Sequence, residues 1–266
     1  MRTISYQSAL TIARLLPIEL RAREVAELYN VKRGRPLPEA PGCLIETRTP
    51  FFQLLHPALR PEVSYKMLDY SEDEAPGARP SAPISIYTDG SKIEGRVGCA
   101  FTCWQDGVEV LTKKIRLESY CTVYQSELLE LRQAIRQTME GDRFWNCDIL
   151  SDSRSSLDAI ANPRSTHPLV NDISLNLAQA TASGGNIELW WVRAHVGITG
   201  NERADELAKQ AALYKKSAAD YDRFPLSFAK RMIRQRTLDA WQQEYSESTK
   251  GRLRSCSSRI FARRTG

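Results

Sequence analysis

Four acidic residues stand where a carboxylate could hold a metal ion or accept a proton: Asp89, Glu127, Asp152 and Asp205. Asp89 closes a short apolar run at an Asp-Gly-Ser turn, and Asp152 follows a second apolar run where a helix is expected to begin. Glu127 shares a helical face with apolar side chains at i+4, i+7 and i+8, where burial penalises an unpaired charge. Oxygen ligands of this kind suit Mg²⁺, with Mn²⁺ as the alternative.

Each of these acids also has an ordinary structural explanation. Asp89 suits a tight turn, Asp152 suits a helix N-cap, and Asp205 suits the positive end of a helix dipole. Glu127 could instead extend to solvent from the edge of its apolar stripe. The combination of strand ends, an inward helix face and a later helix is what predicts a single acidic cage.

The histidine and cysteine residues further limit the kinds of site that the sequence predicts. His195 is one of three histidines and lies on a glycine-flanked loop upstream of Asp205, where it could transfer protons. The six cysteines are scattered without a Cys-x-x-Cys pair, which disfavours zinc and a disulfide framework. Reduced thiols in an intracellular compartment are expected, with nucleus and cytoplasm both left open.

Alternating patterns after residue 83 predict an α/β fold. Three antiparallel strands are expected between Ile84 and Leu117, followed by helices that alternate with two further strands. This order predicts a five-stranded mixed sheet, with three antiparallel and then two parallel strands, and helices on both faces. The later elements are expected at 122–139 (helix), 147–151 (strand), from 153 (helix), 169–182 (helix), 187–192 (strand) and 201–214 (helix).

The flanking regions differ from this centre in composition and charge. Residues 1–80 are expected to form short helices and linker, broken at Pro17 and ending in the acidic, proline-rich run 71–83. Residues 81–213 carry 13 Lys/Arg against 17 Asp/Glu (−4), whereas residues 214–266 carry 13 against 5 (+8). A basic helical segment over 215–266 suits a polyanion partner, although a solvated tail would have the same charge. The longest early apolar run is broken by charges, so no membrane span is expected.

The sequence blocks around the acids resemble those of the type 1 ribonuclease H family. The matching blocks are IYTDGS with Asp89, YQSELLELRQAI with Glu127, ILSDSRSSLDAI with Asp152, and WWVRAHVGITGNERADELAKQA with His195 and Asp205. They occur in the family's order over roughly residues 83–214, and all five positions carry the expected residue type. The resemblance implies a ribonuclease H-like fold for a catalytic domain at 81–214.

The resemblance also implies an activity and roles for particular residues. The expected reaction is endonucleolytic hydrolysis of the RNA strand of an RNA–DNA hybrid, leaving 3′-hydroxyl and 5′-phosphate ends. Two divalent ions would be held by the four acids, with Asp89 between them and His195 assisting proton transfer. Substrate contacts are implied at Gly90, Ser91 and Asn201, where Gly90 would allow close approach of the RNA minor groove.

The flanks are similar to regions that border the ribonuclease H domain in polyproteins of non-LTR (LINE-type) retrotransposons. Residues 1–80 would then be the remnant of a segment that follows a reverse transcriptase, and such a polymerase domain would be a candidate partner. A monomer is expected. The alternative is a folded, nucleic-acid-binding relic that no longer cuts, although the five intact catalytic positions argue against loss of function.

Overall fold

The structure is a computed structural model that describes residues 6–13, 15–54, 56, 62–68, 79–140, 146–215 and 217–247. The chain divides into two compact units, one formed by residues 1–45 and 224–266 and the other by residues 46–223. Most of the predicted 71–83 linker and residues 248–266 of the predicted basic segment lie outside the described residues. Within the described part, no helix has both the length and the apolar character needed to cross a membrane.

Within the described residues, the first unit contains three helices from both ends of the chain. Helices α1 (Tyr6–Ala13) and α2 (Ile18–Lys32) are separated at Pro17, as the sequence predicts, and α2 packs against α7 (Leu226–Glu247). Glu24 is buried in α2 and forms ion pairs with Arg21 and with Arg234 of α7. Arg236 pairs with two further glutamates, so these α7 arginines are engaged inside their own unit.

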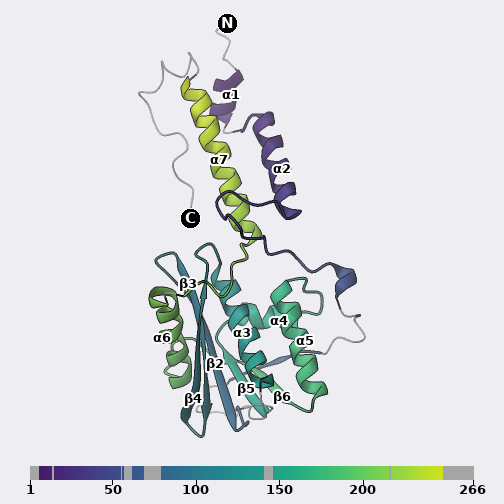
Figure 1. Ribbon diagram of the computed structural model, residues 1–266, viewed down its shortest axis with the longest axis vertical. Helices are drawn as coiled ribbons and strands as arrows, with labels where there is room; N and C mark the ends of the chain where they lie inside the picture. The colour runs from purple at the N-terminus through teal and green to yellow at the C-terminus, as the bar shows by residue number, and fades with distance from the viewer. Residues whose placement is uncertain are drawn as a thin grey trace. The chain divides into compact units, whose positions relative to one another are not determined.

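The second unit is a six-stranded mixed sheet with helices on both faces (Figure 1). The strand order is β1-β6-β5-β2-β3-β4, in which β2, β3 and β4 are antiparallel and β1, β6, β5 and β2 are parallel neighbours. The elements are β1 (Tyr65–Met67), β2 (Ile84–Ile93), β3 (Arg96–Gln105), β4 (Val108–Leu117), α3 (Val123–Met139), β5 (Asn146–Ser151), α4 (Arg154–Ala161), α5 (Pro168–Ala182), β6 (Asn186–Trp191) and α6 (Thr199–Tyr214).

The expected count of five strands is wrong by one. The additional strand, β1, lies in the part of the chain predicted to be helix and linker, and it pairs with β6 from Tyr65 to Met67. A strand of three residues is too short to show the apolar alternation that identifies a half-buried strand. Because β1 is an edge strand, few of its side chains need to be buried, and its composition is therefore like that of a loop.

The expectation that the first long strand ends at Asp89 is also wrong. Strand β2 continues through Gly90 to Ile93 and pairs with β3 along this whole length. The hairpin turn follows at Glu94 and Gly95, which both have positive φ. What ends near Asp89 is the parallel pairing with β5, whose last register pair is Thr88 with Ser151.

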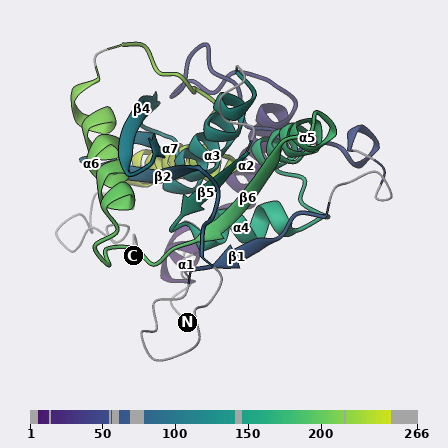
Figure 2. The same ribbon diagram turned by 90° about the horizontal axis from the view of Figure 1, so that it is seen from below.

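The two faces of the sheet are covered by different helices. Helix α6 packs on β2, β3 and β4, whereas α3, α4 and α5 lie on the opposite face (Figures 1 and 2). The main core lies under α3 and α5 and contains Ile86, Phe101, Leu128 and Ile149, all fully buried. On the other face, an added side chain at Gly98 would come within 2.4 Å of the α6 backbone, so glycine permits the close approach of α6.

Candidate active site

The sheet brings two of the predicted acids together at the end of the β2–β5 pairing. Asp89 follows Thr88 on β2, and Asp152 follows Ser151 at the end of β5, so the two acids continue adjacent parallel strands. Carboxyl ends of neighbouring parallel strands are the usual location of ligand sites in open α/β sheets. Asp152 is not the cap of α4, because Ser153 occupies that position and accepts from the backbone nitrogen of Ser156. The Asp152 carboxylate is therefore available to the site.

Glu127 reaches the same place from the first turns of α3. The helix begins in a capping box between Thr122 and Gln125, which fixes its starting residue. Helix α3 then passes very close to β2, because a Cβ at Gly90 would lie 2.7 Å from Ser126 Oγ and 3.0 Å from the Glu127 backbone nitrogen. The Glu127 carboxylate accepts hydrogen bonds from Ser153 Oγ (2.6 Å) and Ser156 Oγ (3.2 Å). These bonds tie Glu127 to the segment that follows Asp152.

Asp205 approaches from the opposite face of the sheet, on the second turn of α6. Its charge acts on Asp89, and its Oδ2 accepts a 2.6 Å bond from Lys209 Nζ one turn along the helix. Strand β2 therefore presents Asp89 between a glutamate from α3 and an aspartate from α6. The four predicted acids therefore lie around the same part of β2 and influence one another's charge, but no three of them have ligand atoms within 4.8 Å of one another; the described residues with that spacing are His195, Glu202 and Asp205.

Burial and mutual repulsion perturb the acids of this cluster. Desolvation, together with the charges of Asp152 and Asp205, raises the pKa of Asp89 from 3.8 to about 8. Desolvation also raises the pKa of Asp152 and of Glu127, opposed at Glu127 by the Ser153 and Ser156 hydroxyls. A bound cation stabilises neighbouring half-buried carboxylates because it neutralises the repulsion between them. Groups of carboxylates with raised pKa values are typical of functional sites.

The comparison with known families agrees with this geometry. The sequence matches the family model for RNase H over residues 81–213, which is half of the chain. The chain belongs to the RNase H family. None of the curated proteins searched matches this sequence. The match covers every element and connection that carries a predicted site residue, whereas β1 and the segment that precedes it lie outside it.

The RNase H match includes the loop that carries His195. This residue is exposed and has a positive φ of 55°, so the loop turns sharply between β6 and α6. Ligand atoms of His195, Glu202 and Asp205 all lie within 4.8 Å of one another. The charge of His195 also acts to lower the pKa of Asp152. His195 is therefore placed at the outer side of the acidic cluster, on the side of α6.

The three residues of the RNase H site that are predicted to contact substrate, Gly90, Ser91 and Asn201, lie in different environments. Asn201 is buried and donates from Nδ2 to Asp152 Oδ2 at 3.4 Å, so in this structure it orients an acid of the cluster. Gly90 packs against α3, as described above, and Ser91 follows it on β2 at intermediate exposure. Their roles toward substrate stay predictions.

Three kinds of residue in the RNase H domain were not anticipated. Glu202 precedes Asp205 by one helical turn, and this spacing could have indicated that both face the loop of His195. Ser153 and Ser156 hold Glu127, but serines next to a strand end have no distinctive pattern. Glu130 is fully buried on α3, and within the described part of the chain neither of its carboxylate oxygens has a partner in good hydrogen-bond geometry.

Proposed function

We propose that this protein hydrolyses the RNA strand of RNA–DNA hybrids endonucleolytically and leaves 3′-hydroxyl and 5′-phosphate ends. The observation that carries this proposal is the convergence of Asp89, Glu127, Asp152 and Asp205 on one end of the β2–β5 pairing, within a chain of the RNase H family. Asp89 comes from within β2, Asp152 from the residue that follows β5, and Glu127 and Asp205 from helices on opposite faces of the sheet. Acids placed in this way would contact a polymeric substrate that lies across this end of the sheet.

The oxygen donors of the four acids suit divalent metal ions, and binding would have to draw their carboxylates closer together than they lie in this structure. All four side chains offer carboxylate oxygens, and the raised pKa of Asp89 reflects repulsion that a cation would relieve. Asp89 would contact both ions, Glu127 and Asp152 would hold one of them, and Asp205 would hold the other. When bound, Mg²⁺ or Mn²⁺ would supply Lewis acidity to the attacking water and to the leaving 3′-oxygen.

The remaining groups of the site would position these ligands and move protons. The Ser153 and Ser156 hydroxyls keep the Glu127 carboxylate turned toward Asp152, and Asn201 holds the Asp152 carboxylate from the other side. An imidazole nitrogen of His195 would accept a proton at the exposed edge of the site, where solvent can carry it away. Lys209 balances the charge of Asp205 in the absence of substrate.

Cleavage of an end-labelled RNA–DNA hybrid in Mg²⁺ tests the proposal directly. RNA–RNA and DNA–DNA duplexes of the same sequence serve as controls. Cutting confined to the RNA strand of the hybrid is expected, with ends that a 3′-hydroxyl-dependent polymerase can extend. A folded protein that binds hybrid without cutting it in Mg²⁺ or Mn²⁺ would instead support the silent, nucleic-acid-binding relic.

The titration of Asp89 predicts a pH dependence of stability without metal. The folded state holds the Asp89 proton up to about pH 8, whereas the unfolded chain releases it near 3.8. The free energy of unfolding should therefore fall as pH rises through this window, by an amount on the order of 5 kcal/mol. Mg²⁺ should reduce this fall because it binds the ionised carboxylates. Urea unfolding from pH 4 to about pH 9, with Mg²⁺ and with EDTA, measures both effects, and matching curves would contradict the prediction.

A glycine substitution tests whether the close packing of α3 sets the position of Glu127. Gly90→Ala should lower the hybrid cleavage rate roughly tenfold to a hundredfold, because the added methyl meets Ser126 and the α3 backbone. Adding Ser126→Ala removes the shorter of these contacts and should recover part of the rate. An unchanged rate in Gly90→Ala would show that α3 can shift without consequence.

The wider biological context remains a proposal based on the flanking sequences. Similarity of residues 1–80 and 215–266 to borders of retrotransposon ribonuclease H domains supports an origin in a non-LTR element, with a reverse transcriptase domain as partner. Hybrid cleavage measured with and without an added polymerase domain would show whether such a partner is needed. Equal rates would mean that the chain acts alone, as expected for a monomer.

A further inference from the structure

Two adjacent phenylalanines outside the matched family region are almost fully exposed. Phe51 and Phe52 are 75% and 86% exposed, the two highest fractions among the large apolar residues that the structure describes. They occupy a single 3₁₀ turn, η1 (Phe51–Gln53), in the segment that precedes β1. Single exposed apolar residues are common, but a neighbouring pair at the tip of a turn leaves two aromatic rings without apolar cover.

The turn itself is held in a fixed conformation. The backbone nitrogens of Gln53 and Leu54 donate to the carbonyls of Pro50 and Phe51, at 2.9 and 3.2 Å. Just before the turn, the Thr49 nitrogen donates to the Thr166 carbonyl at 2.8 Å, which attaches the segment to the α4–α5 connection. The turn, dark blue in Figure 1, accordingly lies beside α5 in both ribbon views.

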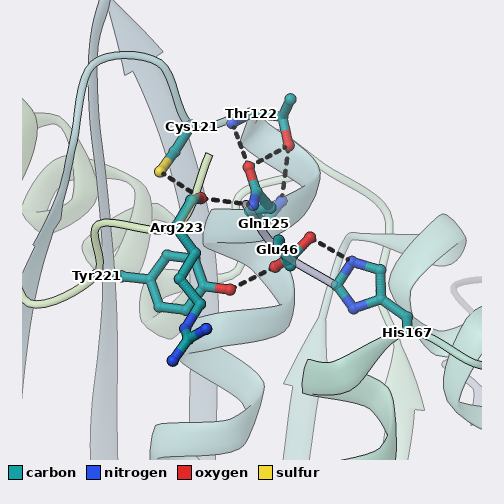
Figure 3. Close-up of polar contacts among 7 residues, drawn as sticks. All are labelled: Glu46, Cys121, Thr122, Gln125, His167, Tyr221 and Arg223. Atoms are coloured by element: carbon teal, nitrogen blue, oxygen red, sulfur yellow. Dashed lines mark hydrogen bonds and ion pairs between the residues drawn. The ribbon is translucent and has the colours of Figure 1, made fainter. Parts of the chain in front are cut away.

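A buried polar cluster fixes the same segment to the domain. Glu46 lies between His167 Nε2, at 3.1 Å, and the Tyr221 hydroxyl, which donates to its other oxygen (Figure 3). His167 and Tyr221, with a smaller contribution from Gln125, hold the pKa of Glu46 below its usual value despite burial. The phenylalanine turn is therefore presented by an anchored segment.

Two exposed arginines lie close in sequence to the contact that attaches the turn. Arg48 and Arg164 are exposed on either side of the Thr49–Thr166 contact, and the structure gives neither an ion pair within the described residues. Next to Thr166, the His167 ring meets the edge of Tyr124 at 5.5 Å between centroids, and Tyr124 precedes Glu127 by one turn of α3. The rings of Tyr124 and His167 therefore connect α3 with the segment that carries the turn.

We propose that Phe51 and Phe52 bind an unpaired stretch of nucleic acid that continues from the hybrid held at the acidic site. This proposal rests on the proposed function for the location of the hybrid. Aromatic side chains stack on exposed bases without sequence preference, and neighbouring arginines neutralise the backbone phosphates. Bases within a duplex have no free face, so the phenylalanines select the unpaired strand beyond the hybrid.

Binding to hybrids with and without overhangs tests this inference. The full chain carrying Asp89→Asn is titrated, by fluorescence anisotropy, into a blunt hybrid and into hybrids with about ten unpaired nucleotides at each of the four strand ends. One overhang should tighten binding roughly tenfold to a hundredfold. The added substitutions Phe51→Ala and Phe52→Ala should abolish this gain and leave blunt-hybrid affinity unchanged.

Matched controls separate failure of this inference from failure of the proposed function. Val108→Ala with Val110→Ala removes two exposed apolar side chains from the edge strand β4 and should retain the overhang gain. No gain from any overhang, or a gain that survives loss of both phenylalanines, would overturn the inference even if the wild type cuts hybrid. If the wild type cuts no hybrid but an unpaired oligonucleotide alone binds through the phenylalanines, the inference stands and the proposed function fails.

Discussion

Replacing Asp89 by asparagine should abolish cleavage and at the same time stabilise the fold. The substitution removes the carboxylate that interacts with both Asp152 and Asp205. The proposed metal ligands on the two faces of β2 would then lack the residue that connects them. Electrostatic stabilisation at such a site is worth several kcal/mol, and each 1.4 kcal/mol changes a rate tenfold. We therefore expect the rate of hybrid cleavage to fall at least about a thousandfold.

The stability change has the opposite sign because Asp89 is unfavourable in the folded protein without metal. Asparagine keeps the size of the side chain but removes its repulsion with the neighbouring acids, so the free energy of unfolding at pH 8 should rise. The decline in stability between pH 4 and pH 8 should become shallower, and the stabilisation by Mg²⁺ should largely disappear. Cleavage assays and urea unfolding on the same preparations measure the two effects together.

A matched control uses an acid outside the cluster. Asp158 lies on α4, exposed and bonded to the Tyr65 hydroxyl, and Asp158→Asn should leave the cleavage rate and the Mg²⁺ effect unchanged. If Asp89→Asn reduced activity and stability in parallel, the acid would be a structural residue of the sheet. A rate close to that of the wild type would remove Asp89 from the site altogether.

The acids of the site could be predicted from sequence because each is tied to a recognisable element boundary or helical face. Asp152 follows an apolar strand, and Glu127 lies on the apolar face of a strongly capped helix, so their positions follow from local rules. The end of the β2 strand at Asp89 was mispredicted because Asp-Gly-Ser is typical of turns. In the fold, this glycine lies within the strand and makes room for α3.

Other features depend on tertiary contacts that leave no local pattern. Strand β1 exists only because β6 offers an edge, and three residues show no periodicity. The serine hydroxyls that hold Glu127 come from a different element, so their role depends on how α3 and α4 meet. Glu130 is similar: its residue type is typical of exposed positions, yet the packing of α3 on the sheet encloses it.

The enclosed Glu130 leads to the second large effect, a gain in stability on its removal. Its side chain is fully buried, and in the described part of the chain neither carboxylate oxygen has a partner in good hydrogen-bond geometry. Desolvation, with smaller contributions from Asp89, Glu127 and Asp152, raises its pKa well above 4.5, although the Thr88 hydroxyl acts in the opposite direction. A buried polar group with poorly formed hydrogen bonds costs roughly 1–3 kcal/mol, and the raised pKa adds to this cost as the pH rises above 4.5.

Glu130→Met should therefore raise the free energy of unfolding at pH 7 by about 3 kcal/mol. Because the folded wild type retains a proton that the unfolded chain releases, its stability falls as pH rises above 4.5, and the variant should lack this contribution. The difference between the two proteins should accordingly widen with pH. Glu130→Gln, which removes the charge but keeps the polar group, should remove the pH dependence and recover only part of the gain. Urea unfolding between about pH 5 and pH 9, followed by tryptophan fluorescence, measures both. A Met variant less stable than the wild type throughout this range would show that Glu130 has favourable partners in the folded protein.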